Sequence, residues 1–240
     1  MPTAFRNRAI AWSASAFPSA AETPAPFRPA SPASAARAEA EAEYRRALDI
    51  YAKLAADNPK VPDHRKELAW CHENLSVVLR RLGRPAEARD GCDQAIAIRE
   101  VLVQEVPKVP MYRSDLARSY RRRGLARGDL DDLAGAAADA RRAIAVWEGL
   151  PSRTGEEWFE TACARATLAG LAGRDGAGVS AAEGKAEADQ AMALLRKAVG
   201  MGYRDPVAVR TDSALDPFHQ REDFQKLVQE VEQNSAAKPK

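Results

Sequence analysis

The stretch NPKVPDHRKEL at residues 58–68 returns in closely similar form as VPKVPMYRSDL at residues 106–116. The matched positions, each pair 48 residues apart, are Pro59 and Pro107, Pro62 and Pro110, Arg65 and Arg113, and Leu68 and Leu116. A fixed spacing of this size is typical of a repeat architecture, in which one supersecondary unit is stacked several times. The sequence therefore predicts at least two copies of one structural unit.

Two amphipathic segments lie between the proline-rich stretches. In the first, apolar residues recur three or four positions apart from Leu68 onward, and Gly83 ends the pattern. Pro85 suits the first turn of a second helix, whose apolar stripe runs from Ala88 to Val106. Such a pair predicts an antiparallel helical hairpin, and because one hairpin cannot bury both of its faces, several must stack. The fold is therefore predicted to be all-α.

The spacing of small and large residues within this hairpin resembles that of the tetratricopeptide repeat (TPR). The positions that carry the resemblance are Leu75, Ser76, Leu79, Gly83, Ala88, Cys92 and Ala95, and in the next copy Gly124, Ala136, Ala140 and Ala143. The second copy has Arg123 and Arg127 where apolar residues are usual, so we expect Leu125 and Leu130 to supply that packing. The resemblance implies a TPR-like α-α superhelix, a solenoid of antiparallel hairpins.

Longer segments resemble the C-terminal TPR arrays of large planctomycete-type bacterial Ser/Thr protein kinases. They include AIREVLVQEVPKVPMYRSDLA at 97–117 and AGAAADARRAIA at 134–145, and the resemblance covers roughly residues 38–232. It implies an interaction module of a kind often carried behind a bacterial kinase domain. The location is expected to be cytoplasmic, because the three cysteines are odd in number and far apart, as in a reducing compartment. The resemblance implies no catalysis in this chain, since the chain contains no glycine-rich kinase loop, His-Arg-Asp or Asp-Phe-Gly. We therefore expect no ATP binding.

The resemblance and the composition together divide the chain into five segments. They are a disordered Ala/Pro/Ser-rich tail (1–36), TPR-like repeats (37–172), a flexible Gly-rich loop (173–185), a last repeat helix with a C-terminal cap (186–232), and a disordered end (233–240). The first segment lacks an apolar period and cannot offset its ordering entropy. In the cap, Asp205-Pro206 and Asp216-Pro217 each predict a helix start. The apolar residues expected to seal the end of the solenoid are Val207, Leu215, Phe218, Phe224 and Leu227.

Composition and charge argue against several classes of function. The formal net charge of the 240 residues is +2, so no strong field points to nucleic acid or a membrane surface as the partner. The three cysteines are widely spaced and form no Cys-x-x-Cys pair, which indicates buried thiols rather than a disulfide framework or a zinc site. We expect no cofactor and no metal.

Candidate catalytic motifs have simpler interpretations. GRDGAGVS at 173–180 lacks the Gly-Lys-Ser/Thr ending of a phosphate-binding loop. His64 and His72 lie eight residues apart, about 12 Å along a helix, which is too far to share one metal ion. The carboxylate pairs 131–132 and 156–157 lie at predicted helix starts, where negative charge favours the helix dipole. The chain is predicted not to be an enzyme, although one using Glu and His residues of 156–224 stays an alternative.

The arginine-rich run RSYRRRGLAR at 118–127 is the strongest candidate for a functional surface. The first helix of each TPR unit lines a concave groove, and the residues at those positions are Trp70, Glu73, Val77, Arg80, Arg118, Arg121 and Leu125. Guanidinium groups beside an indole could hold an acidic peptide, with Trp70 and Arg118 expected side by side. The residues of the carboxylate clamp that binds chaperone tails do not match. The alternatives are a solvated basic face and a regulatory or substrate-recruiting tail of a Ser/Thr kinase.

Overall fold

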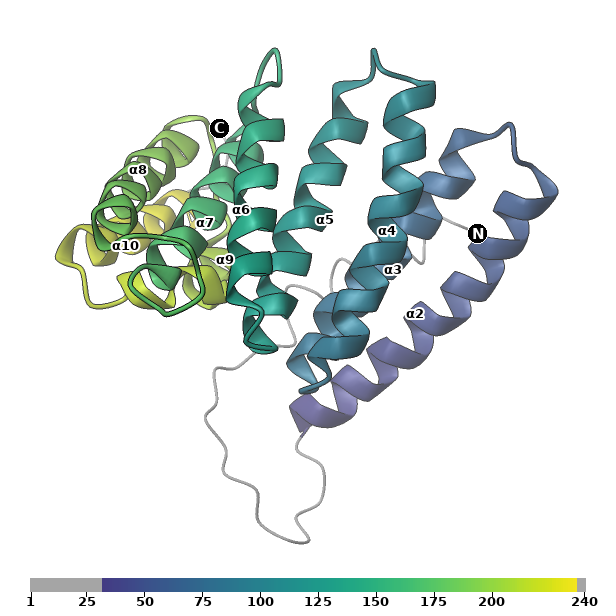
Figure 1. The fold of residues 1–240 in the computed structure, drawn as a ribbon, viewed down its shortest axis with the longest axis horizontal. Helices are drawn as coiled ribbons and strands as arrows, with labels where there is room; N and C mark the ends of the chain where they lie inside the picture. Colours follow the sequence, from purple (N-terminus) through teal and green to yellow (C-terminus); the bar gives the residue numbers. More distant parts are fainter. Residues whose placement is uncertain (1–31, 237–240) are drawn as a thin grey trace, which may run out of the picture.

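The computed structural model describes residues 32–236. Within them lie nine α-helices, one 3₁₀ helix and no strand, so the predicted all-α fold is confirmed. The elements are α2 (Pro32–Asp57), α3 (Pro62–Arg81), α4 (Pro85–Glu105), α5 (Pro110–Asp129), α6 (Leu133–Glu148), α7 (Gly155–Leu171), α8 (Ala181–Gly200), α9 (Pro206–Thr211), η1 (Ser213–Phe218) and α10 (Glu222–Ala236). Each helix from α2 to α8 packs against the next, which gives a solenoid of antiparallel hairpins (Figure 1).

The 48-residue period is expressed in the helices themselves. α3 and α5 are both 20 residues long, and their first residues, Pro62 and Pro110, occupy matching positions of the repeat. α4 and α6 also start at matching positions, but α4 has 21 residues and α6 only 16. The length of the second helix therefore varies between units, while the register of the first helix is maintained.

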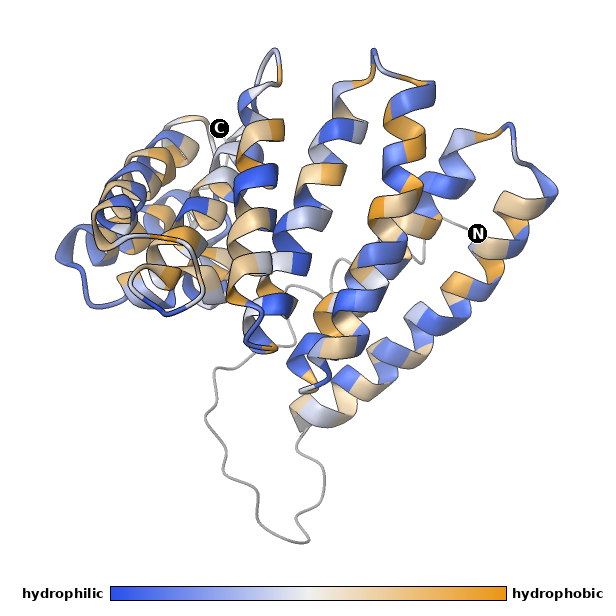
Figure 2. Cartoon of the chain, viewed as in Figure 1, coloured by the Kyte–Doolittle hydropathy of each residue, from blue (hydrophilic) through white to orange (hydrophobic). Residues whose placement is uncertain are grey.

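Small residues let the helices approach closely, and larger ones fill the remaining space. Alanines at the hairpin contacts are almost fully buried, among them Ala95, Ala140 and Ala143. Trp147 is the largest fully buried side chain and lies among apolar residues of α4 to α7. Figure 2 shows that each helix carries both hydrophilic and hydrophobic residues, as expected when one face packs and the other contacts water.

The boundaries of the segments expected to lack structure are shifted in the described chain. α2 begins at Pro32, inside the predicted tail 1–36, and residues 1–31 lie outside the described part. α8 begins at Ala181, inside the predicted loop 173–185. The Ser180 hydroxyl caps this helix by accepting from the Glu183 amide at 3.1 Å. The preceding Gly-rich loop is anchored by the buried side chains of Ala177 and Val179. At the other end, α10 continues to Ala236.

The C-terminal cap matches the expectation in part. Asp205 caps α9 and Pro206 is its first residue, as predicted. The helix start predicted at Asp216-Pro217 is wrong, because both residues lie inside η1, whose cap is the Asp212 carboxylate. Leu215, Phe218, Phe224 and Leu227 are buried, whereas Val207 is 41% exposed and seals nothing.

Two predicted helix caps are present, and one packing expectation is wrong. Asp132 caps α6 by accepting from the Gly135 amide at 3.0 Å. Thr154 and Glu157 form a reciprocal capping box at the start of α7. Leu130 is exposed and does not replace the apolar residues missing from the second unit. There the buried Arg123 is held by the Asp139 carboxylate at 2.7 and 2.8 Å.

Candidate functional site

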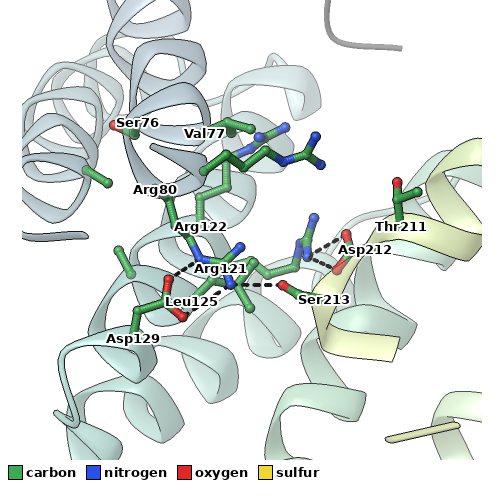
Figure 3. A pocket seen from close by; sticks show the side chains of 13 residues that line it. Ser76, Val77, Arg80, Arg121, Arg122, Leu125, Asp129, Thr211, Asp212 and Ser213 are labelled. Carbon is green, nitrogen blue, oxygen red and sulfur yellow. Dashed lines mark hydrogen bonds and ion pairs between the residues drawn. The ribbon is translucent and has the colours of Figure 1, made fainter. Parts of the chain in front are cut away.

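Two adjoining cavities lie along the side of the solenoid formed by the first helix of each hairpin. The smaller, of about 320 Å³, lies between α3, α5 and the α9–η1 segment (Figure 3). The larger, of about 640 Å³, extends along α3, α5 and α7 to the residues that join α8 to α9. Both are lined by Val77, Arg81, Arg121, Arg122, Thr211 and Asp212. The two cavities are therefore parts of one hollow, which we call the groove.

The C-terminal cap forms one wall of the groove. Arg80 of α3 contacts the Asp129 carboxylate at 2.6 Å and donates to the Ser213 hydroxyl at 2.9 Å. Arg121 of α5 contacts Asp212 at 3.1 Å (Figure 3). Burial would raise the pKa of Asp212, but Arg121 and the Ala214 amide lower it below its usual value. Asp212 is therefore ionised, and it ties the cap to the repeats.

Four of the seven groove residues named from the sequence line this hollow: Val77, Arg80, Arg121 and Leu125. Arg121 is nonetheless only 5% exposed, because it also contacts the Glu160 carboxylate of α7 at 2.5 Å. Its pKa is raised by Asp212 and Glu160 in spite of burial. The expectation that Arg121 is a surface charge is wrong, since α7 and the cap both supply carboxylates to it.

Glu73 points into the protein rather than into the groove. It is 1% exposed and accepts hydrogen bonds from Arg99 of α4 and Ser119 of α5. Arg122 contacts it from the groove side at 2.9 Å. Burial alone would raise the pKa of Glu73, but Arg99, Arg122 and Arg118 lower it to about 2. Glu73 thus joins two hairpins through a buried ion network.

Trp70 and Arg118 line neither cavity, and they pack against different elements. The Trp70 ring lies edge-on to the Tyr44 ring of α2, with centroids 5.9 Å apart. Arg118 contacts Asp115 at 3.1 Å and reaches Glu156 at 3.3 Å. The expected pairing of Trp70 with Arg118 is therefore replaced by contacts of each with its nearest helices.

The sequence interpretation missed several residues of the groove. Arg81 and Arg122 directly follow Arg80 and Arg121, which the sequence placed in the groove. Counting positions along the helix placed neither Arg81 nor Arg122 on the concave face. Met201 and Val207 belong to the cap and lie far along the chain. A local period could not identify them, because their position depends on how α9 and η1 fold back over the repeats.

Metal ligands and reactive thiols are the other groups to consider in residues 32–236. Between residues 32 and 236, no group of three or more His, Cys, Asp or Glu side chains could hold a metal ion. All three cysteines are free and buried, as predicted. Burial raises the pKa of Cys71 and of Cys92 to about 12, so neither is a thiolate at neutral pH.

Within residues 32–236, none of the helices combines the length and the apolar character that crossing a bilayer requires.

The fold and the groove define an α-solenoid of helical hairpins. Residues 68–105, which cover most of α3 and all of α4, match the family model described as tetratricopeptide repeat. This segment is the hairpin on which the sequence resemblance was first based. No curated protein matches the chain. Neither comparison supports the resemblance to planctomycete kinase arrays.

Proposed function

We propose that this protein is a non-enzymatic interaction scaffold that holds a peptide or protein segment in the groove. The observation that carries the proposal is the pair of adjoining cavities along α3, α5 and α7. Solenoids of this kind present extended concave surfaces to their partners. Binding pockets also tend to be concave and to contain a few convergent polar groups.

The residues proposed to face the bound segment are a revision of those named from the sequence. Val77, Arg80 and Leu125 stay in the set, and Arg81 and Arg122 join it. Arg121 leaves the set, because it is buried and held by Glu160 and Asp212. Glu73 and Arg118 act behind this surface, since Glu73 of α3 pairs with Arg122 of α5 and Arg118 of α5 pairs with Glu156 of α7. No observation favours a kinase over another partner.

Site-specific photo-crosslinking would test the groove as the binding surface. A photoreactive amino acid at Val77, which lines both cavities, is expected to capture a partner segment. The same group at Val101, an exposed position on α4 outside both cavities, is the matched control. Mass spectrometry of the adducts should identify a segment joined to position 77 and absent from position 101. Identical adduct sets from both positions would contradict the proposal.

A further inference from the structure

The first helix of the solenoid has a helix neighbour on one side only. α2 packs against α3, and Tyr44 and Ala47 of α2 are buried. Each helix from α3 to α8, by contrast, packs between two other described elements. In Figure 1, α2 forms the outer end of the solenoid, and no other described helix lies beyond it. One face of α2 is therefore open.

A line of exposed residues runs along this open face. Its members lie three or four positions apart, which is the spacing of one helix face, and most of them are alanines. They are Ala35, Ala38, Ala42, Arg45, Asp49, Ala52 and Ala56. The line covers about 32 Å of helix, and its small side chains allow another helix to approach closely.

The line is complementary to itself in an antiparallel arrangement. Arg45 and Asp49 lie two positions to either side of Ala47 and have opposite charges. The next pairs at equal distances from Ala47 are alanines on both sides, namely Ala42 with Ala52 and Ala38 with Ala56. A two-fold interface presents the same surface of both copies, so every contact in it occurs twice. An axis level with Ala47 therefore places Arg45 of each copy opposite Asp49 of the other.

Charged side chains on this face lack partners within residues 32–236. Glu39, Asp49 and Lys53 are exposed, and none of the three makes an ion pair or a side-chain hydrogen bond there. In the antiparallel arrangement, Glu39 of one copy and Lys53 of the other flank the same two layers of alanines, as charged residues do beside the seam of a coiled coil. Charges left unpaired in one copy thus complement those of a second copy.

Arg45 can reach a second copy and keep its own contacts. Its Nε and Nη2 atoms donate to Glu41 at 3.0 and 2.8 Å, and Nη2 lies 3.7 Å from Glu87. The Nη1 atom is left for Asp49 of a second copy, and the Arg45 side chain is 51% exposed. Glu41 is also bound by Arg84 at 2.8 and 2.9 Å, so it stays paired if Arg45 moves.

The chain's own sequence is poorly suited to cover this face. A preceding helix of the repeat would lie 48 positions before α3, at residues 14–33. Proline inside a helix removes a hydrogen bond and clashes with the preceding turn. That stretch contains five prolines, which are Pro18, Pro24, Pro26, Pro29 and Pro32. A helix from a second copy is the better match.

We propose that the open face of α2 binds the same face of a second copy, which gives an antiparallel two-fold dimer. Arg45 pairs with Asp49 and Glu39 pairs with Lys53, each pair occurring twice, while the alanines let the two helices approach. No residue that lines the groove belongs to α2, so both grooves stay open in the dimer. The inference goes beyond the proposed function and does not rest on it. A partner with two matching segments would gain affinity from the two grooves.

Sedimentation velocity of the full 240-residue chain tests the proposal through charge reversal. The unmodified chain should change from monomer to dimer between about 1 µM and 1 mM. Asp49→Arg places arginines opposite each other and should weaken dimerisation at least tenfold, and Arg45→Asp should do the same with carboxylates. The double variant Arg45→Asp with Asp49→Arg restores both ion pairs in reverse and should recover most of the affinity.

Mixing the two single variants is a sharper form of the same test. Neither Arg45→Asp nor Asp49→Arg should dimerise well alone. In an equimolar mixture, position 45 of each chain faces an opposite charge at position 49 of the other, so a heterodimer should form. Asp90→Arg, a reversal of an exposed carboxylate on α4, is the matched control and should leave the affinity of the dimer unchanged. Melting temperatures of all variants separate loss of dimerisation from loss of folding.

Three results would overturn the proposal. A chain that stays monomeric throughout would mean that α2 is uncovered, or is covered by residues 1–31 or by another protein. A dimer indifferent to Asp49→Arg would mean that another surface associates. A folded double variant that fails to recover affinity would contradict the antiparallel pairing. None of these results affects crosslinking from Val77, so failure of the dimer and failure of the groove are distinguishable.

Discussion

The hairpins α3–α4 and α5–α6 follow the same backbone plan but fill their interiors with different chemistry. Glu73 of α3 and Arg121 of α5 occupy matching positions of the repeat, and both are buried. Glu73 is satisfied by Arg99 of its own hairpin, whereas Arg121 is satisfied by Glu160 and Asp212 from elements further along. The position that holds Arg99 in the first hairpin holds the fully buried Trp147 in the second.

A second set of positions shows the reverse exchange. Leu75 and Leu79 of the first hairpin correspond to Arg123 and Arg127 of the second, and both arginines contact the Asp139 carboxylate. Each hairpin thus buries ionic groups in one place and apolar groups in another. The repeat therefore maintains helix register and close helix contact, while the groups that fill the interior can change from charged to apolar.

The largest effect is expected from Asp139→Asn. Asp139 is 0% exposed and holds two arginines, so loss of its charge leaves Arg123 and Arg127 with only their more exposed partners, Asp93 and Asp132. Removal of one partner of a buried ion pair typically lowers the free energy of unfolding by about 3–5 kcal/mol. Urea unfolding at pH 7 measures this loss, with Asp90→Asn on the exposed face of α4 as the control.

The combined change Arg123→Leu, Arg127→Leu and Asp139→Gly gives the second hairpin the residues of the first at these positions. It should recover at least half of the stability lost in Asp139→Asn, because apolar groups can replace a buried ion network. A triple variant less stable than Asp139→Asn would contradict the view that the two chemistries are interchangeable.

Acid should act on the ion network of the first hairpin. The pKa of Glu73 is about 2 in the folded protein, against 4.5 for an unperturbed glutamate. Since the folded value is the lower one, its contribution is complete above pH 4.5 and is lost as the pH falls toward 2. This difference between the two pKa values corresponds to at most about 3 kcal/mol of unfolding free energy.

Glu73→Gln should therefore be less stable than the unmodified chain at pH 7 but lose less stability between pH 5 and pH 3. Urea unfolding at several pH values measures the stability at pH 7 and the stability lost between pH 5 and pH 3. Asp212, whose pKa is also lowered, leaves part of the acid sensitivity in the variant. If the free energy of unfolding changed equally with pH in the two proteins, Glu73 would not titrate as the structure indicates.

The sequence was sufficient for the hairpins but not for the groove. Pro62, Gly83 and Pro85 mark helix boundaries through local backbone chemistry, and the structure places boundaries at or beside all three. The partners of Arg121 lie 39 and 91 positions further along, where no period relates them to it. Burial of a charged side chain depends on such distant partners. For that reason, an arginine-rich helix was interpreted as a surface.

Small residues at the hairpin contacts offer a finer test of the same comparison. In the first hairpin, Ser76 of α3 faces Gly91 of α4, where an added Cβ would lie 2.5 Å from the serine hydroxyl oxygen. In the second hairpin the glycine lies on the first helix, α5. A Cβ added to Gly124 would lie 3.3 Å from the Cβ of Asp139 on α6. One member of each contact is thus a glycine.

Gly91→Ala should cost about 1 kcal/mol, since crowding against Ser76 outweighs the better helix propensity of alanine. In a Ser76→Gly background, which copies the arrangement of the second hairpin, the same change should be neutral or stabilising. A double-mutant cycle by urea unfolding measures the coupling between the two positions. Additive effects would mean that this contact does not limit the approach of α3 and α4.

The smallest effect is expected where the two hairpins differ at the surface. Arg65 and Glu105 form a two-pronged ion pair at 2.5 and 3.0 Å, whereas the matching positions of the second unit hold Arg113 and Arg153. Arg153 instead stacks over the Trp158 ring, 3.4 Å from its centroid. Because exposed ion pairs contribute little and are screened by salt, Glu105→Gln should lower Tm by no more than about 2 °C in dilute buffer. The difference should disappear in 1 M NaCl. A larger loss that persists in salt would mean that this pair fixes the turn between the hairpins, and that the second unit relies on the Arg153–Trp158 contact for the same purpose.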